Sequence, residues 1–176
     1  MLDFFRYYPL EVPDFFSEIQ HFVEAADTEK WFQQKHYPDH FSPEFIEKFK
    51  PWFENLIGSN ISGPTSGFVN ITKFNGLHNE TPWHNEGGFA NGLKDSRTGE
   101  TQVRMEREFV CFFWLAGERG QGGALRFIND HDGTMGIAEL DPPGFMLATK
   151  DTIHSVEHYS SQQFRVNFTV DFSVDQ

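Results

Sequence analysis

The residues of this chain that could do chemistry are histidines and carboxylates. The 176 residues include eight histidines, 26 acidic residues and a single cysteine, Cys111. The sequence has neither a Gly-rich phosphate loop nor a Gly-x-Ser-x-Gly elbow, the usual signals of a phosphate cradle and of a serine nucleophile. One cysteine can build neither an internal disulfide nor a cysteine metal cluster. A metal site made of imidazole and carboxylate groups is the chemistry that remains.

His84 and Glu86 form a His-x-Glu pair. Alternate side chains of a β-strand face the same side, so this spacing presents an imidazole and a carboxylate together as two adjacent metal ligands. His154, which follows the apolar run 145–149, is the candidate for a third ligand. Two histidines and one carboxylate on one face of an octahedron leave three positions open, as in non-haem Fe(II) oxygenases. His84, Glu86 and His154 are therefore the predicted catalytic and metal-binding residues.

Other interpretations of the histidines stay open at this point. His78 and Glu80 repeat the His-x-Glu pattern six residues earlier, and strand alternation cannot choose between the two pairs. His158 stands four residues after His154, the spacing of a helical zinc site, although the flanking Thr, Ile, Val and Tyr favour a strand. In a third interpretation, the three candidate ligands are unrelated surface residues.

The pattern of apolar and polar residues changes near residue 60. Two amphipathic helices are expected before it, around residues 14–34 and 43–57, and the second has Ser42 as a suitable N-cap and Gly58 at its end. After it, short apolar runs alternate with Gly, Pro, Asn and Asp, which is typical of an all-β sandwich or barrel. The clearest strands are expected at residues 67–73, 108–116, 124–128, 144–149 and 163–172.

The segment 87–108 mixes Gly, Asn and Ser with many charges. Its composition predicts a solvated excursion or hairpin. Because it begins one residue after Glu86, a second hypothesis is a lid that folds over bound substrate.

Five short sequence features follow one another in a defined order along the chain. They are the His-x-carboxylate pair, a Gly-Gly-x-Leu-x-Phe run (Gly122–Phe127), a Pro-Gly before an apolar strand (Pro143-Gly144), then His154, then Arg165. Over residues 67–172 this order resembles the Fe(II)- and 2-oxoglutarate-dependent oxygenases of the prolyl-hydroxylase type. The resemblance implies a mainly β fold with N-terminal helices, a double-stranded β-helix or jelly roll. The single domain would span residues 1–176, with a helical part over about 1–60 and the jelly-roll core over about 61–176.

The resemblance also implies cofactors and roles. Fe(II) would be held by the three predicted ligands, 2-oxoglutarate would be the cosubstrate, and Arg165 would pair with its distal carboxylate. A guanidinium matches a carboxylate with two parallel hydrogen bonds and stays charged at any working pH. Asn167, on the same strand face as Arg165, would help to bind the cosubstrate. Trp114 is the third predicted cofactor-binding residue, because it stands in the strand before Gly122-Gly123, where relatives often have a tyrosine that binds the cosubstrate. Phe74 stands where relatives often have another tyrosine, and Glu86 stands where this branch usually has Asp, so the contacts of the cosubstrate differ from the usual pattern.

The implied activity is hydroxylation of an unactivated C–H bond in a peptidyl proline, an amino acid or another small metabolite, with O2 as co-reactant. Alternatives from other classes are a cupin-like metal-binding jelly roll without oxygenase activity and a degenerate domain that keeps only the scaffold.

The formal net charge of −12 argues against nucleic-acid and anionic-membrane partners and leans toward cationic substrates. The cytoplasm is the expected location, because a single cysteine fits a reducing compartment. A monomer or weak homo-oligomer is expected. The sequence has no stretch near the roughly 18 apolar residues that span a bilayer.

Overall fold

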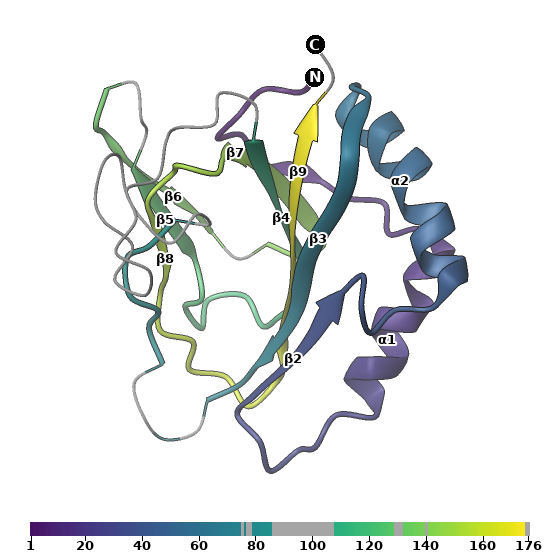
Figure 1. Ribbon diagram of the computed structural model, residues 1–176. Coiled ribbons are helices and arrows are strands. Elements are labelled where there is room, and N and C mark those ends of the chain that lie inside the picture. Colours follow the sequence, from purple (N-terminus) through teal and green to yellow (C-terminus); the bar gives the residue numbers. More distant parts are fainter. Residues whose placement is uncertain (75, 77–78, 86–107, 129–131, 140, 175–176) are drawn as a thin grey trace, which may run out of the picture.

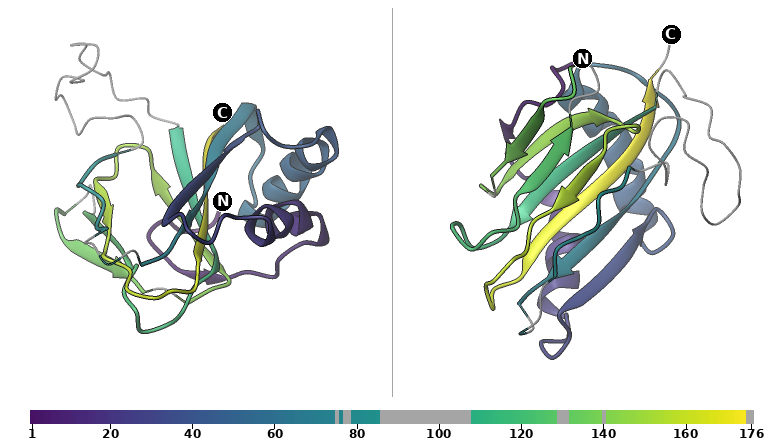
Figure 2. Two further views of the ribbon diagram at one scale, coloured as in Figure 1. Left: turned by 90° about the horizontal axis from the view of Figure 1, so that it is seen from below. Right: turned by 90° about the vertical axis from the view of Figure 1, so that its left-hand side faces the viewer.

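The computed structural model describes residues 1–74, 76, 79–85, 108–128, 132–139 and 141–174, and its strands form two sheets (Figure 1). The larger sheet runs in the order β1 (Tyr8–Pro9), β7 (Gly144–Thr149), β4 (Glu108–Ala116), β9 (Arg165–Val174), β3 (Ile61–Thr72) and β2 (Phe32–Tyr37). The smaller sheet runs in the order β6 (Met135–Ala138), β5 (Leu125–Ile128) and β8 (His154–Val156). The strand pairs within both sheets are antiparallel. The helices cover one face of the larger sheet and the smaller sheet lies across the other face, as Figure 2 shows in two further views. The predicted mainly β, jelly-roll architecture is confirmed.

Helix α2 (Pro43–Ile57) forms where the sequence predicts it. The Ser42 hydroxyl accepts the backbone N–H of Phe45 at 3.2 Å, and Gly58 ends the helix in the left-handed region at φ +69°. Ser42 is itself anchored, because the Glu18 carboxylate accepts its backbone N–H at 2.8 Å and its hydroxyl at 3.1 Å. The apolar stripe of α2 is buried against the sheet through Phe45, Phe49, Phe53 and Ile57.

The first helix is much shorter than the predicted span of 14–34, so that prediction is wrong beyond Glu24. A 3-10 turn (η1, Asp14–Phe16) leads into α1 (Ser17–Glu24). The chain then turns at Asp27, whose carboxylate accepts the N–H of Glu29 at 2.9 Å. Residues 32–37 become β2, the edge strand that pairs with β3 over its full length. Cross-strand pairing thus overrides the local amphipathic pattern, and the first 60 residues supply two strands as well as helices.

The hydrophobic core lies between the helices and the larger sheet. Phe168 of β9 sits among the rings of α2, β2 and β4, including Phe49, Tyr37 and Phe113. On β4, Cys111 and Phe113 face this core, whereas Phe112 and Trp114 belong to the cluster on the other side of the sheet. The larger sheet therefore separates the core from the space between the two sheets. Within the described part of the chain, no helix combines the length and apolar character needed to cross a membrane.

Candidate metal and cosubstrate site

His84 and His154 lie side by side across an antiparallel bridge. The backbone N–H of His84 donates to the carbonyl of His154 at 3.0 Å, and the reverse hydrogen bond measures 2.8 Å. The two ring centroids are 4.4 Å apart, and the ring of Phe112 packs edge-on against His154 at 5.0 Å. The structure thus brings together two histidines that are 70 positions apart in the sequence.

Each imidazole is oriented by a backbone carbonyl two residues earlier in the chain. The Nδ1 atom of His84 lies 2.7 Å from the carbonyl oxygen of Pro82, and the Nδ1 atom of His154 lies 2.9 Å from that of Thr152. A carbonyl oxygen can only accept, so Nδ1 carries the hydrogen and Nε2 is the unprotonated nitrogen of each ring. Metal-binding histidines are commonly fixed in this way by a carbonyl or carboxylate acceptor. The pair can therefore offer two imidazole nitrogens to a transition-metal ion.

The predicted third ligand, Glu86, lies outside the described residues, as do His78 and most of the segment 87–108 proposed as a lid. Among the residues that are described, no group of three or more His, Cys, Asp or Glu side chains is placed to hold a metal ion. The carboxylate of Glu80, which belongs to the alternative His78–Glu80 pair, forms an ion pair with Arg126.

A helical zinc site at His154 and His158 is ruled out by the local structure. Residues 154–156 form strand β8, so the two histidines do not share one face of a helix. His158 instead accepts the backbone N–H of Asn79 through Nδ1 at 3.1 Å and packs edge-on against Phe74.

A cavity of about 370 Å³ lies between the two sheets, within the roughly 300–1,000 Å³ typical of small-molecule sites. Five of the six predicted site residues line it, namely His84, His154, Arg165, Asn167 and Trp114. The remaining lining comes from both sheets and from the segment 79–82: Trp31, Phe32, Phe68, Asn70, Thr72, Asn79, Glu80, Thr81, Pro82, Phe112, Leu125, Val156 and Thr169.

Arg165 lies buried in this cavity, with 6% of its surface exposed. Burial lowers the pKa of its guanidinium to about 10, an effect that Tyr159 partly offsets, so Arg165 still carries its charge at neutral pH. Its Nε atom has no hydrogen-bond partner among the described residues, and neither does Oδ1 of Asn167 two residues later. A buried guanidinium without a carboxylate partner is costly, so this arrangement favours an anionic ligand at Arg165.

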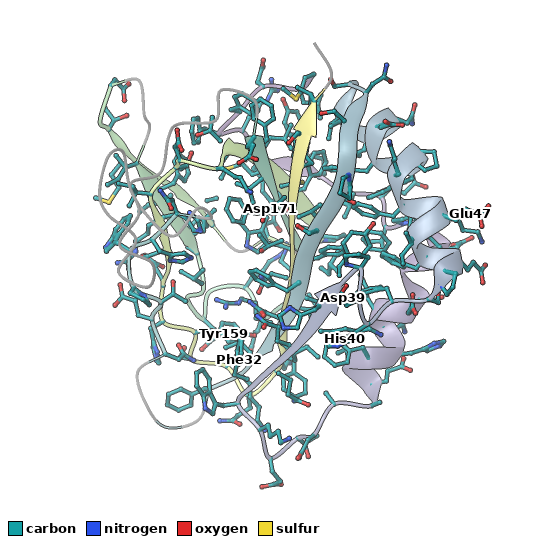
Figure 3. The ribbon with its side chains drawn as sticks, viewed as in Figure 1. Phe32, Asp39, His40, Glu47, Tyr159 and Asp171 are labelled. Atoms are coloured by element: carbon teal, nitrogen blue, oxygen red, sulfur yellow. The ribbon has the colours of Figure 1, made fainter. Side chains whose placement is uncertain are left out.

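Tyr159, a residue that the sequence analysis missed, holds Arg165 in place. Its ring lies under the guanidinium at 5.7 Å, and its hydroxyl donates to the carbonyl of Gln163 at 2.7 Å and accepts the N–H of Glu118 at 3.0 Å. The carboxamide of Asn79 bonds to both the N–H and the carbonyl of Tyr159, at 2.8 and 3.1 Å. In the view of Figure 3, the labelled Tyr159 lies toward the end of β9 where Arg165 begins the strand, and Asp171 lies farther along β9. No sequence pattern could have found the Asn79–Tyr159 contact, because 80 positions separate its two residues.

The glycine pair of the Gly-Gly-x-Leu-x-Phe run makes room for these contacts. Gly122 and Gly123 have φ values of +78° and +79°. A Cβ on Gly123 would lie 3.1–3.2 Å from the Tyr159 ring and the Arg165 side chain, and one on Gly122 would lie 2.0 Å from the carbonyl oxygen of His158. Glycine is therefore required by both conformation and space.

We expect Gly122→Ala to lower the free energy of unfolding by at least about 3 kcal/mol, because left-handed strain adds to a clash with backbone that cannot move aside. Gly133→Ala is the matched control, since Gly133 has φ +70° but a Cβ added there would meet no atom within 4 Å. It should cost only about 1–2 kcal/mol, the strain alone. Urea unfolding measures both variants, and equal losses would contradict the clash.

Solved structures of known proteins share the fold of this chain, although no sequence comparison finds a match. No family model and no curated protein sequence matches the chain. Solved structures do match: a prolyl-4-hydroxylase from Pseudomonas putida has a TM-score of 0.62 at 12% identity, over 97% of this chain and 92% of that one. An oxidoreductase of the 2OG-Fe(II) oxygenase family from Burkholderia pseudomallei has a TM-score of 0.57 at 8% identity, over 89% and 76% of the two chains. The non-heme alpha ketoglutarate dependent epimerase SnoN from nogalamycin biosynthesis has a TM-score of 0.59 at 11% identity, over 92% and 72%. The chain therefore has the jelly-roll fold of the 2-oxoglutarate-dependent oxygenases, as the sequence resemblance predicts.

Proposed function

We propose that this chain is an Fe(II)- and 2-oxoglutarate-dependent dioxygenase that hydroxylates an unactivated C–H bond. The observation that carries the proposal is the placement of His84, His154 and the buried Arg165 on one cavity. Two correctly oriented imidazoles suit the metal, and an uncompensated guanidinium suits a dicarboxylate cosubstrate. The likeness to known oxygenases supports this class of chemistry. Since one of the matched structures is an epimerase, the fold alone does not fix hydroxylation as the outcome.

In the proposed site, His84, His154 and Glu86 hold Fe(II). Arg165 binds the distal carboxylate of 2-oxoglutarate, and Asn167 lies on the same face of β9 to assist it. When iron and cosubstrate are bound, they supply the oxidative chemistry in which O2 and 2-oxoglutarate give succinate, CO2 and a hydroxylated substrate. The protein contributes ligands, a fixed cation and a cavity between the two sheets. A carboxylate at Glu86 favours hydroxylation over halogenation, because halogenating relatives have a small residue at that position.

The sharpest test is anaerobic addition of Fe(II) and then 2-oxoglutarate to metal-free protein. The proposal predicts a weak visible metal-to-ligand absorption that requires both additions, followed by succinate release when O2 and a substrate are admitted. A cupin-like protein would bind metal without this absorption, and a degenerate scaffold would bind neither. Absence of the band in folded protein that has bound iron would reject the proposal.

Removing the ring beneath Arg165 should weaken cosubstrate binding selectively. A cation–π contact contributes about 0.5–2 kcal/mol, so we expect Tyr159→Leu to raise the dissociation constant for 2-oxoglutarate about 2- to 30-fold. Tyr159→Phe keeps the ring and should lose less. Titration of the visible band gives both constants.

The matched control for this change is Tyr37→Leu. Tyr37 is also buried, and its hydroxyl is within 3.0 Å of the Thr65 hydroxyl, but it lies in the helix-side core. Both leucine variants should lower stability, whereas only Tyr159→Leu should change cosubstrate affinity. A comparable loss of affinity in Tyr37→Leu would mean that general loosening, and not the position of Arg165, causes the effect.

A further inference from the structure

Beyond the cosubstrate residues, the inner face of the larger sheet continues as an uncharged wall. Register places Phe32, Thr72 and Arg165 in one row across β2, β3 and β9, and Gln34, Asn70 and Asn167 in the next. Because neighbouring strands lie about 4.8 Å apart, β2 is about 10 Å from the strand that carries Arg165. We name this surface the β2–β3 wall and define it as Trp31, Phe32, Gln34, Phe68, Asn70 and Thr72. All of these residues except Gln34 line the cavity directly.

None of the residues that form the β2–β3 wall bears a formal charge. The exposed members of the wall are Gln34 and two aromatic residues, Trp31 and Phe32, which are 43% and 41% exposed with their ring centroids 5.6 Å apart. Among the described residues that line the cavity, only Glu80 and Arg165 bear a formal charge at neutral pH, apart from the histidines. Glu80 is paired with Arg126, and Arg165 is two strands away from β2. An ion placed against the wall would lose water and gain no compensating charge from the described residues of β2 and β3 that line the cavity.

Two carboxamides give the wall its polar character. Nε2 of Gln34 donates to Oδ1 of Asn70 at 2.9 Å. This bond leaves the amide hydrogens of Asn70 and the amide oxygen of Gln34 as a neighbouring donor and acceptor. Rotating both carboxamides by half a turn exchanges the two roles and still leaves one of each. A ligand amide, which offers both a carbonyl and an N–H, complements this pair. A carboxylate offers only acceptors, and an amidinium offers only donors.

We propose that the β2–β3 wall is the substrate subsite and that it binds an uncharged carboxamide joined to a flat ring, which packs against Trp31 and Phe32. This inference deepens the proposed function and rests on it only for the identity of the bound molecule as a substrate. The net charge of −12 on its own favours a cationic substrate. Close contact with the wall outweighs that long-range preference, because distant exposed charges are screened by salt.

Benzamide, benzoate and benzamidinium test the inference because they have nearly the same shape and differ in charge and hydrogen bonding. Ligand-observed NMR titrations on metal-free protein saturated with 2-oxoglutarate, which occupies Arg165 and keeps benzoate from binding there, measure their affinities without any turnover. We expect benzamide to bind with a millimolar dissociation constant, at least about tenfold tighter than either ion. Phe32→Ala should weaken benzamide binding about tenfold, because it removes the ring surface.

Placing a charge on the wall should reverse the selectivity. Gln34→Glu, at an exposed position, should make benzamidinium the preferred probe, and Asn70→Asp should do the same from the neighbouring strand. Gln20→Glu adds an equal charge on α1, which lies on the other side of the sheet, and should leave the preference for benzamide intact.

Two results would overturn the subsite. One is equal binding, or no binding, of the three probes by protein that binds 2-oxoglutarate. The other is a shift in Gln20→Glu as large as that in Gln34→Glu, which would trace selectivity to overall charge. Selective benzamide binding that responds to Gln34→Glu, in protein that fails to give the iron and 2-oxoglutarate absorption, would keep the subsite and reject the proposed function.

Discussion

Replacing His84 or His154 by alanine is expected to reduce iron affinity by at least about a hundredfold and to abolish 2-oxoglutarate turnover. Each ring supplies one metal-binding nitrogen whose orientation is fixed by its own backbone carbonyl. Even residues that only orient a ligand contribute about 10- to 100-fold to metal affinity, so loss of the ligand itself should cost no less. Glu86→Ala should behave alike if its carboxylate is the third ligand. Equilibrium binding of Fe(II) under anaerobic conditions and succinate release measure the two effects.

Two histidine controls make this test specific. His21→Ala removes an imidazole from α1, on the other side of the sheet, and should leave iron binding unchanged. His78→Ala should also retain activity, because the sequence register assigns the ligands to His84 and Glu86. If His78→Ala loses iron while His84→Ala keeps it, the upstream pair holds the metal and this register is wrong.

Local signals in the sequence predict much of this fold. The bounds of α2 follow from Ser42, Pro43 and Gly58, which act through capping and backbone conformation at the ends of the helix itself. Strand β4 has the predicted bounds because a run of bulky apolar residues between polar ends suits a central strand with both faces covered. These features depend on neighbours in sequence, so one chain without relatives is enough to predict them.

Features decided by distant pairing could not be predicted in this way. Strand β2 looks amphipathic and polar on its own, and only its partner β3 makes it extended. Strand β8 is three residues long, too short for a periodic pattern, although it carries His154. The hydrogen bonds between Asn79 and Tyr159, and the packing of the Tyr159 ring against Arg165, likewise depend on tertiary structure.

The candidate site was partly accessible to sequence analysis because strand alternation is a local property. Arg165 and Asn167 share a parity on β9 and both line the cavity. Alternation did not reveal which face of β4 meets the core. Phe112 and Trp114 both lie on the cavity side, and Phe112 contacts His154. The side of the sheet taken by the helices decides this, and no residue of β4 encodes it alone.

Arg165→Ala is expected to raise the dissociation constant for 2-oxoglutarate by about two to four orders of magnitude while iron affinity stays nearly unchanged. Losing one partner of a buried, charge-assisted pair costs several kcal/mol, whereas the metal is bound by other residues. Arg165→Lys should restore only part of the affinity, because an ammonium cannot make the two parallel hydrogen bonds of a guanidinium. The visible titration with iron and 2-oxoglutarate separates the two affinities.

Unfolding would not explain such a loss, because the charge on Arg165 opposes folding. Its pKa is about 10 in the folded protein, well below the usual range of an arginine, so the native state binds this proton less tightly than the unfolded chain does. The penalty is fully present at neutral pH and is relieved only as the pH rises above about 10. Arg165→Ala loses packing contacts, but it also removes this electrostatic penalty, and the second effect offsets part of the first. The thermal midpoint of the variant at pH 7 should therefore stay close to that of the parent protein. A folded Arg165→Ala protein with unchanged 2-oxoglutarate affinity would place the anion site elsewhere in the cavity.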